Sequence, residues 1–301
     1  MNKVIVILNP AAKGDRARLL KEKIEALSLR ISVRMTSAPG DAGKIARNAL
    51  QEGVKTIVAA GGDGTINEVV NGIAGSDVQF GIFPLGTMNV FALELGIPLN
   101  DLARAWKVIE EGHCREIDLA MANDHYFVQL AGVGLDAQVV RETSVGSKKA
   151  LGPLSYMLSL INVVARKPPL LSAETAEGLR FEGRFIMVGN GRFYGGPFTM
   201  FKKASLDDGR LDVVVFRNQS HWHLIRYIQA LLFKNHDMLP DVDYFQTSSL
   251  RVRSEQAVPF ELDGELSDSL PVNFHFSEKC LRVLVPANGK NLTREGEIHA
   301  E

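Results

Sequence analysis

The chain has 301 residues and a formal net charge of −1, with 46% hydrophobic and 23% charged residues. This balance is typical of a globular protein, and the length fits one large domain or two of ordinary size. The charge excludes a global attraction to nucleic acid or anionic membranes, and two widely spaced cysteines, Cys114 and Cys280, exclude a disulfide framework and a zinc motif.

Apolar segments near the start and in the middle of the chain are short. The run Val4–Leu8 is too short for the core of a signal peptide, and Asn9 and Pro10 end it before any small-residue cleavage site. The longest later apolar stretch, around residues 156–165, falls far below the ~18 residues that a membrane span needs. We therefore expect a cytoplasmic protein that is not integral to a membrane.

The first third of the chain alternates predicted strands with predicted helices. Val4–Leu8 is a continuous apolar run, as in a strand buried on both faces, and residues 15–27 carry apolar side chains at helical spacing. The strands and helices expected after them lie at Ile31–Met35, 41–50, 56–60, from Ile66, 80–83 and 102–110. Strands separated by helices of this length imply βαβ units and a parallel sheet.

From about Ile117 the pattern changes to short strands bounded by turns, which predicts an antiparallel, sandwich-like β domain. A hairpin is expected at 117–130, further strands at 185–188, 211–216, 250–252, 258–262, 272–276 and 281–285, and helical patches at 154–165 and 221–233. The predicted fold class is α+β with two domains, residues 1–118 and 119–286, and an active site in the cleft between them. The tail, residues 287–301, is assigned to neither domain and could pack on the first one.

The sharpest motif follows the strand predicted at 56–60 and consists of Gly61, Gly62, Asp63, Gly64, Thr65, Ile66 and Asn67. Phosphates bind at this place in open α/β sheets, because backbone N–H groups and the helix dipole point at the anion. Glycines let the backbone approach phosphates closely, Thr65 and Asn67 add donors, and Asp63 supplies the carboxylate that a magnesium–phosphate complex needs. A glycine turn with a capping threonine is the plainer alternative, but the position after a buried strand favours phosphate binding.

Polar residues follow other strands of the same predicted sheet. Asn9 begins the segment after the first strand, Thr36 ends the second strand, and residues 86–89, which include Thr87, follow the strand at 80–83. Carboxyl ends of parallel strands meet at one edge of a sheet, so these residues should converge there. Their agreement indicates a nucleotide site.

Together these motifs resemble the diacylglycerol-kinase catalytic domain family, which belongs to the superfamily of NAD kinases and sphingosine kinases. The resemblance is carried by the NPxxxG that starts at Asn9, the GGDGT that starts at Gly61 and the PLGTxN that starts at Pro84. It covers nearly the whole chain, since residues 206–212 resemble the family's DDG-x-L-D stretch and residues 260–265 its D-G-E stretch. It implies a soluble, ATP-dependent kinase of a lipid hydroxyl, such as that of diacylglycerol or phosphatidylglycerol.

The same resemblance implies a role for each site residue. Glu265 would be the general base that takes the proton from the lipid hydroxyl, and Asp63 would organise the catalytic Mg²⁺. A structural Mg²⁺ would lie at Ser205, Asp208 and Arg210, where only Asp208 binds through its side chain, because a guanidinium cannot ligate a cation. The residues implied to bind ATP are Asn9, Thr36, Gly61, Gly62, Asp63, Gly64, Thr65, Ile66, Asn67 and Thr87.

Without the resemblance, two of these segments have plainer interpretations. Residues 207–209 form a good β-turn sequence, and Asp263 with Gly264 is a common hairpin signal, which would make Glu265 a solvated turn carboxylate. The chain also departs from the family pattern G-T-x-N-D, because Val90 follows Asn89 where an Asp would help organise the catalytic magnesium. An arginine that is common just afterwards is replaced by Leu93, so we expect the magnesium network to differ.

Two segments could bring the protein to a membrane surface, although a core helix and a structural loop are the plainer interpretations. Residues 148–157 place two lysines before an apolar helix, and residues 192–198 combine aromatic side chains with glycines. The expected partners are a membrane lipid substrate, met by transient peripheral contact, and no nucleic acid. A homodimer is left open.

Two other functions remain open. One is a kinase of a soluble alcohol such as NAD, against which the D-G-E stretch argues because it belongs to the lipid branch. The other is a nucleotide-binding regulator with little transfer activity, which Val90 keeps open. The identity of the lipid cannot be derived, because many sets of apolar residues build equivalent acyl pockets.

Overall fold

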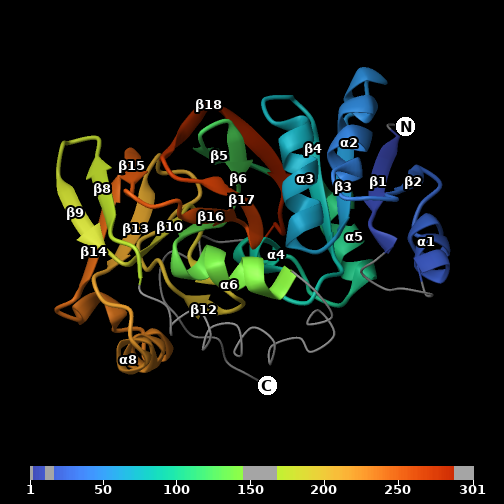
Figure 1. The fold of residues 1–301 in the computed structure, drawn as a ribbon. Coiled ribbons are helices and arrows are strands. Elements are labelled where there is room, and N and C mark those ends of the chain that lie inside the picture. The colour runs from blue at the N-terminus through green and yellow to red at the C-terminus, as the bar shows by residue number, and fades with distance from the viewer. Residues whose placement is uncertain (1–2, 11–16, 145–167, 288–301) are drawn as a thin grey trace. The chain divides into compact units, whose positions relative to one another are not determined.

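The structure is a computed structural model that describes residues 3–10, 17–144 and 168–287 (Figure 1). The chain forms two compact units. The first contains the chain up to Ile117 and the chain from Lys279 onward, and the second contains Asp118–Glu278. The predicted domain boundaries lie at residues 118 and 286, and in the structure the last strand runs on into the first unit.

The first unit is built on a parallel sheet with the strand order β2-β1-β3-β4. Both central strands are fully buried, which is why their sequences are continuous apolar runs without alternation. The end of β18 adds to this sheet, because Arg282 and Val283 pair in parallel with Gln79 and Phe80. The four strands are β1 (Val4–Leu8), β2 (Ile31–Met35), β3 (Thr56–Gly61) and β4 (Gln79–Pro84).

Helices follow the strands of this sheet, as the βαβ pattern predicts. Two of them pack very closely, because a Cβ on Gly72 would lie 2.6 Å from the carbonyl oxygen of Gly43. Glu68 accepts hydrogen bonds from the backbone of Gly40 (2.8 Å) and Ala42 (3.0 Å), and these contacts fix α3 against the start of α2. The helices are α1 (Ala17–Glu25), α2 (Asp41–Gln51), α3 (Asp63–Ile73), α4 (Val90–Glu94) and α5 (Leu102–Glu111).

The second unit is an antiparallel β-sandwich. One sheet has the order β14-β13-β10-β7-β16-β17, and the other contains β15, β8, β9 and the first half of β18. Side chains of both sheets form one buried core, in which Phe127, Phe260 and Phe274 are the largest members. Together with the first unit, this confirms the predicted α+β class, an α/β domain followed by an antiparallel β domain.

The strands of the second unit alternate between two cores. Leu211, Val213 and Val215 of β13 face the sandwich core, whereas Val214 and Phe216 belong to a second cluster on the other face of the same sheet. The strands are β5 (Cys114–Ala122), β6 (His125–Phe127), β7 (Leu130–Val133), β8 (Leu171–Thr175), β9 (Arg180–Gly183), β10 (Phe185–Gly189), β11 (Phe193–Tyr194), β12 (Phe198–Thr199), β13 (Leu211–Phe216), β14 (Val242–Thr247), β15 (Ser249–Arg253), β16 (Pro259–Leu262), β17 (Glu265–Ser269) and β18 (Val272–Leu284).

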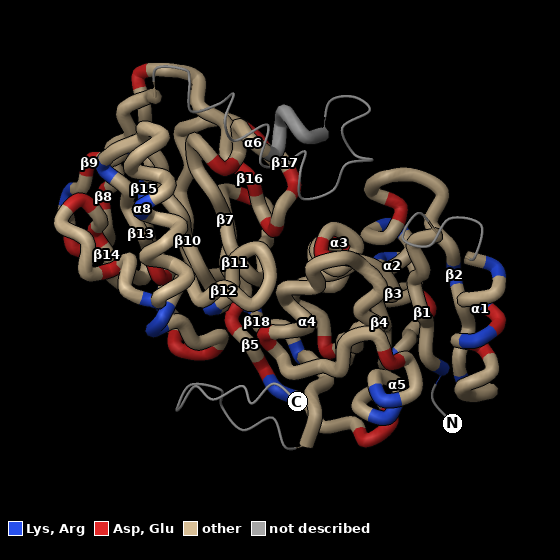
Figure 2. Tube along the Cα trace, turned by 90° about the horizontal axis from the view of Figure 1, so that it is seen from below, with Lys and Arg blue, Asp and Glu red and all other residues tan. Residues whose placement is uncertain are grey.

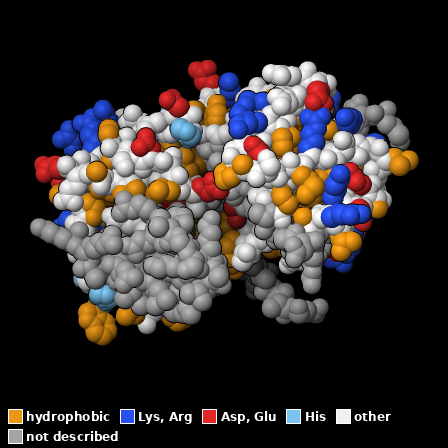
Figure 3. Space-filling model, turned by 45° about the vertical axis from the view of Figure 1, so that its right-hand side comes forward, with side chains coloured by type: hydrophobic (Ala, Val, Ile, Leu, Met, Phe, Trp, Pro, Cys, Tyr) orange, Lys and Arg blue, Asp and Glu red, His pale blue; other side chains and the backbone are white. Residues whose placement is uncertain are grey.

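Helical segments supply the other side of the second cluster. They are α6 (Leu135–Ser144) and α8 (His221–Leu232), and the short 3₁₀ helix η4 (His236–Met238) follows α8 in the chain. Ser220 caps α8, because its hydroxyl accepts a hydrogen bond from the backbone of His223. Within the described ranges, no helix is long and apolar enough to cross a bilayer. On the face shown in Figure 3, basic and acidic side chains are interspersed, in keeping with a net charge of −1.

Two predicted element boundaries are wrong. The helix expected from Ile66 begins at Asp63, because the glycine-rich stretch itself forms its first turn. The strands expected at 272–276 and 281–285 form one strand, β18, because the polar residues between them contain no glycine or proline and continue the extended chain. The helix predicted at 154–165 lies outside the described residues, as do all of residues 148–157.

Candidate functional site

Four strand ends form the carboxyl edge of the sheet in the first unit. Leu8 is in register with Met35 of β2 and with Ala60 of β3, and Gly61 is in register with Pro84 of β4. The residues that follow these strands therefore start at one edge. This brings Asn9, Thr36, the glycine-rich stretch and the segment with Thr87 together, as the sequence predicts.

The backbone connections at this edge are short and well defined. The Asn9 N–H donates to the carbonyl of Ala60 (3.0 Å), and the Thr36 N–H donates to the carbonyl of Leu8 (2.9 Å). The Leu85 N–H donates to the carbonyl of Gly61 (2.9 Å). These bonds continue the sheet ladder by one residue, so the turns after the strands are held together.

Two glycines allow the loops after β3 and β4 to touch. A Cβ on Gly86 would lie 2.5 Å from the Cα of Gly62, so a larger residue at position 86 would force the two loops apart. A Cβ on Gly61 would lie 2.5 Å from the hydroxyl of Thr65, so glycine there lets the first turn of α3 fold back on the end of β3. The result is a surface of bare backbone, which suits the close approach of a phosphate.

The first turn of α3 is the second part of this surface. Gly62 is the N-cap residue and offers no side chain, and the first intrahelical hydrogen bond is the one from the Ile66 N–H to the carbonyl of Gly62 (3.1 Å). N–H groups that precede the first intrahelical bond point out of the helix, where the dipole also favours an anion. Ile66 is fully buried, so it can contribute only through its backbone.

Polar side chains of the predicted site already hold one another. The Asn9 amide donates to the Thr65 hydroxyl (3.0 Å), and Thr65 is only 6% exposed. The Asn71 amide donates to Asn67 Oδ1 (3.0 Å), which orients the Asn67 side chain. Thr87 is exposed at the tip of its loop, within reach of a ligand in solution.

Asn89 shapes the loop that carries Thr87. Its Oδ1 accepts a hydrogen bond from the Gly86 N–H (2.9 Å), and its Nδ2 donates to the Gly86 carbonyl (2.8 Å). Asn89 adopts a left-handed conformation with φ 50°, which asparagine tolerates better than most residues. Val90 then opens α4 and is buried, so a side chain at this place packs in the interior.

Asp63 has a structural contact that the sequence does not predict. Its Oδ1 accepts a hydrogen bond from the Phe91 N–H in the first turn of α4 (3.3 Å). The carboxylate therefore has a role in the protein itself, besides the contact with magnesium that the sequence predicts. Asp63 links the start of α3 to the start of α4, so its removal changes more than ligand binding.

In the second unit, Asp263 locks the turn that precedes Glu265. Asp263 and Gly264 both have positive φ, 50° and 87°, as a tight two-residue hairpin turn requires. The Asp263 carboxylate accepts hydrogen bonds from the backbone of Val128 (2.9 Å), Gln129 (2.9 Å) and Leu130 (3.1 Å). It is a structural clamp on the segment that joins β6 to β7.

A buried carboxyl pair lies beneath the same turn and was not predicted. Glu261 is fully buried and accepts a hydrogen bond from the Gly264 N–H (2.7 Å), and burial, together with the neighbouring Asp136, raises its pKa. Tyr194 donates a hydrogen bond to Asp136 (2.7 Å). The sequence did carry one signal, because a carboxylate between Phe260 and Leu262 interrupts an apolar strand.

Glu265 is the first residue of β17 and is exposed. It pairs with Leu262 across the hairpin, directly after the locked turn. An exposed carboxylate on a rigid turn can meet a hydroxyl group without a prior rearrangement of the backbone.

In the loop with Ser205, Asp208 and Arg210, the structure joins Asp208 to Arg210, whereas the Ser205 hydroxyl donates to Asp207 Oδ1 (2.7 Å). The Arg210 N–H donates to Asp208 Oδ1 (3.0 Å), and the Gly209 N–H donates to Asp118 Oδ2 (2.8 Å). Burial raises the pKa of Asp208, and the charge of Asp118 raises it further, although the hydrogen bond from the Arg210 N–H lowers it. Asp118, at the middle of β5, was not predicted.

The donor chemistry of this loop fits a hard cation in part. A cation would relieve the repulsion between Asp208 and its carboxylate neighbours, and carboxylate oxygens are ligands that Mg²⁺ accepts. In the part of the chain that the structure describes, no three Asp, Glu, His or Cys side chains converge as metal ligands. An ion here would therefore need backbone carbonyls and water besides Asp208.

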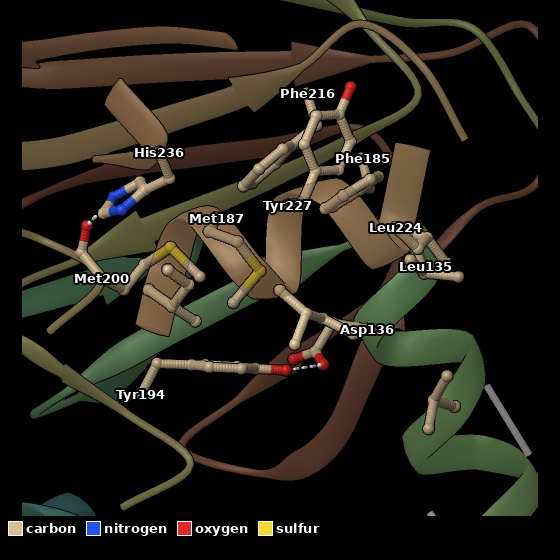
Figure 4. Close-up of a pocket in the computed structure, with 13 residues that line it drawn as sticks. Leu135, Asp136, Phe185, Met187, Tyr194, Met200, Phe216, Leu224, Tyr227 and His236 are labelled. Atoms are coloured by element: carbon tan, nitrogen blue, oxygen red, sulfur yellow. Dashed lines mark hydrogen bonds between the residues drawn. The ribbon is translucent and has the colours of Figure 1, made fainter. Parts of the chain in front are cut away.

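The second unit contains an apolar cavity of about 150 Å³ beneath α8 (Figure 4). An apolar cavity of about this size stays dry and binds benzene-sized molecules. Polar groups lie at its edge, where Tyr194 meets Asp136, and where a ring nitrogen of His236 bonds the carbonyl of Met200 (2.7 Å). The lining residues are Leu135, Asp136, Val139, Phe185, Met187, Tyr194, Met200, Phe216, Leu224, Tyr227, Ile228, Leu231 and His236.

Comparisons with known proteins agree with this geometry. The model of the diacylglycerol kinase catalytic domain matches residues 3–122, and that of the YegS C-terminal NAD kinase beta sandwich-like domain matches residues 129–285. A diacylglycerol kinase from Staphylococcus carnosus is 31% identical over 95% of this chain and 96% of its own, and one from Bacillus subtilis is 30% identical over 95% and 97%.

A solved structure of a diacylglycerol kinase from Bacillus anthracis has a TM-score of 0.77 and 26% identity, and the match covers 95% of this chain and 98% of that one. The match thus includes both units. The chain belongs to the diacylglycerol kinase family, a family of lipid kinases, which confirms the predicted resemblance.

Proposed function

We propose that this protein transfers the γ-phosphoryl group of ATP to the hydroxyl of a lipid such as diacylglycerol or phosphatidylglycerol. It would work in the cytoplasm and meet the membrane only peripherally. The observation that carries the proposal is the carboxyl edge of the first sheet, where Gly62 and Gly86 touch and bare backbone adjoins the first turn of α3. Membership of the diacylglycerol kinase family supports the same reaction.

In this proposal the first unit binds the nucleotide. Phosphate oxygens would accept hydrogen bonds from backbone N–H groups of the glycine-rich turn, and Thr36 and Thr87 would contact the rest of the nucleotide. Bound Mg²⁺ would neutralise charge on the phosphates, which is the largest need in phosphoryl transfer. Asp63, a hard oxygen ligand at the same turn, is the residue here that would hold it.

The second unit would supply the acceptor side. Glu265 would take the proton from the lipid hydroxyl, because it is exposed directly after a turn that Asp263 clamps. The cavity beneath α8 supports a lipid over a soluble alcohol such as NAD, since its walls are almost wholly apolar. A nucleotide-binding regulator is the second candidate, because Val90 leaves the family's usual magnesium carboxylate absent.

The reaction can be tested directly. Purified protein is incubated with γ-labelled ATP and with diacylglycerol, phosphatidylglycerol or NAD, and the products are separated by chromatography. Label in an organic-soluble phospholipid is the expected result. Phosphorylation of NAD alone would replace the lipid by a soluble acceptor, and ATP binding without labelled product would favour a regulator.

Asp63 offers a prediction that separates chemistry from structure. Asp63→Asn keeps an acceptor for the Phe91 N–H but removes the charge, so it should fold normally and lose transfer by at least ~10²-fold. Asp63→Ala should lose transfer and also about 1 kcal/mol of stability, because the hydrogen bond to α4 disappears. Thermal melts and the transfer assay together measure both effects. An Asn variant with normal turnover would remove this carboxylate from the mechanism.

The metal loop gives a prediction that does not depend on activity. If Asp208 holds Mg²⁺, EDTA should lower the melting temperature, because an ion bound only to the native state stabilises it. Asp208→Asn keeps an acceptor for the Arg210 N–H and should melt at the same temperature with and without EDTA. Asp124→Asn, an exposed site in the same unit, is the matched control and should respond like the wild type. A wild-type curve that EDTA does not move would count against a structural ion.

A further inference from the structure

Helix α8 is apolar on two opposite sides. Its inner side packs in the second cluster, and Leu224, Tyr227 and Leu231 line the cavity. Its outer side and the residue after it expose Trp222 (81%), Ile225 (48%), Leu232 (56%) and Phe233 (77%). An amphipathic helix on the surface of a globular protein normally turns its charged residues toward the solvent. The large apolar side chains exposed on α8 therefore indicate a contact with an apolar partner.

Charge favours a lipid surface as that partner. Residues 218–236, which contain the whole helix, include no Asp or Glu, and no acidic segment lies along α8 in Figure 2. Arg226 of the helix pairs with Asp241, and Lys234, which follows Phe233 in the chain, is exposed. A helix with no carboxylate of its own, with exposed Trp and Phe side chains and with a lysine next to them, has the composition of an element that lies in the interface of an anionic bilayer.

The position of the cavity adds a second, independent argument. Ile228 is 48% exposed and also lines the cavity, so the helix surface and the cavity wall are continuous through this residue. The cavity behind the exposed side of α8 has almost wholly apolar walls. A bilayer fits this arrangement, because its acyl chains could move into an apolar space.

We propose that α8 is a membrane-docking helix, which seats Trp222, Ile225, Leu232 and Phe233 in the headgroup region while its inner side walls the cavity that receives part of an acyl chain. The cavity part rests on the proposed function, since only a lipid substrate brings an acyl chain. The docking part needs only a lipid surface. It also differs from the sequence-based expectation, which gave membrane contact to residues 148–157 or 192–198.

One of those segments has a different role in the structure. Residues 193–198 belong to a small hairpin of β11 and β12, in which Phe193 pairs with Thr199 and Tyr194 pairs with Phe198. Tyr194 lines the cavity and bonds Asp136.

Tryptophan fluorescence tests the docking directly, because the chain has only two tryptophans. Trp106 is 6% exposed in α5 of the first unit, and Trp222 is 81% exposed. In a Trp106→Phe variant, Trp222 is the only reporter. Its emission should shift to the blue on mixing with vesicles of phosphatidylcholine and phosphatidylglycerol in equal amounts, and lipids brominated in the acyl chain should quench it. If the protein co-sediments with vesicles but the emission of Trp222 does not change, then another surface binds the vesicles and α8 is not the docking helix.

A double variant, Trp222→Ser with Phe233→Ser, tests the energetic role of the surface. Each large side chain withdrawn from the interface should weaken vesicle binding roughly 10- to 100-fold. Leu179→Ser is the matched control, because Leu179 is 59% exposed between β8 and β9 of the same unit and should bind as the wild type does. Equal melting temperatures show that all three proteins are folded.

The outcomes separate the inference from the proposed function. If the wild type binds vesicles, the double variant does not, and the protein phosphorylates no lipid, then α8 docks to membranes. In that case the proposed function is wrong, and so is the acyl-chain role of the cavity. Vesicle binding that the double variant keeps would overturn the inference whatever the activity. If the wild type binds no vesicles and forms a dimer that the double variant dissociates, the outer side of α8 contacts a second copy and the proposal fails.

Discussion

Replacing Glu265 with glutamine should lower kcat by ~10²–10⁴-fold, the usual effect of removing a general base, while the KM for ATP stays nearly unchanged. The side chain keeps its shape but can no longer accept the proton of the attacking hydroxyl. Because Glu265 is exposed at the start of β17, the melting temperature should not change. Initial rates over a range of ATP concentrations provide the measurement.

The control is Glu255→Gln, an exposed glutamate in the turn between β15 and β16 of the same unit. It should have wild-type rates. If Glu265→Gln instead weakens ATP affinity and keeps its maximal rate, Glu265 is a binding residue. The base would then have to be sought at Asp63, and the mechanism proposed above would be wrong in its central assignment.

Replacing Asp263 with alanine should destabilise the protein by roughly 3 kcal/mol or more. Three buried backbone N–H groups, those of Val128, Gln129 and Leu130, would lose their common acceptor, and unsatisfied buried groups cost ~1–3 kcal/mol each. Urea denaturation gives the change in unfolding free energy. Activity should fall as well, because the turn that presents Glu265 loses its clamp.

Asp268→Ala is the matched control, since Asp268 is an exposed carboxylate on β17 and surface changes of this kind usually stay within ~0.5 kcal/mol. Asp263→Asn should be intermediate, because one amide oxygen can still accept while its NH₂ group would face an N–H donor. Near-normal stability of the alanine variant would show that the clamp is not needed for the fold.

The sequence predicts the first unit well because its signals are local. Continuous apolar runs such as Val4–Leu8 indicate strands covered on both faces, and glycine, aspartate and threonine directly after one of them indicate a phosphate site. The start of α3 was missed because glycine is a poor helix former, so propensity hides a first turn that contains Gly64. Here the structure of the loop, not its residue preferences, decides where the helix begins.

The parts of the site that could not be predicted depend on contacts between distant segments. Asp263 bonds the backbone of Val128 at a separation of 135 residues, and nothing in a single sequence specifies that pairing. For α8 the pattern predicts a helix but not its exposed side. The sequence shows that Trp222, Ile225 and Phe233 are apolar. Tertiary packing decides whether another segment of the chain covers them.

The path of β18 has a consequence for how the protein is made on the ribosome. This strand supplies Leu281, Val283 and Leu284 as buried side chains, and it pairs with β4, which was synthesised some two hundred residues earlier. Until it emerges, the nascent first unit carries β4 as an open sheet edge, a hazard for pairing with other chains. In a fragment that ends at Ile117, β4 would remain an unpaired edge strand. The first unit is thus the first part of the chain to be synthesised and the last to be completed.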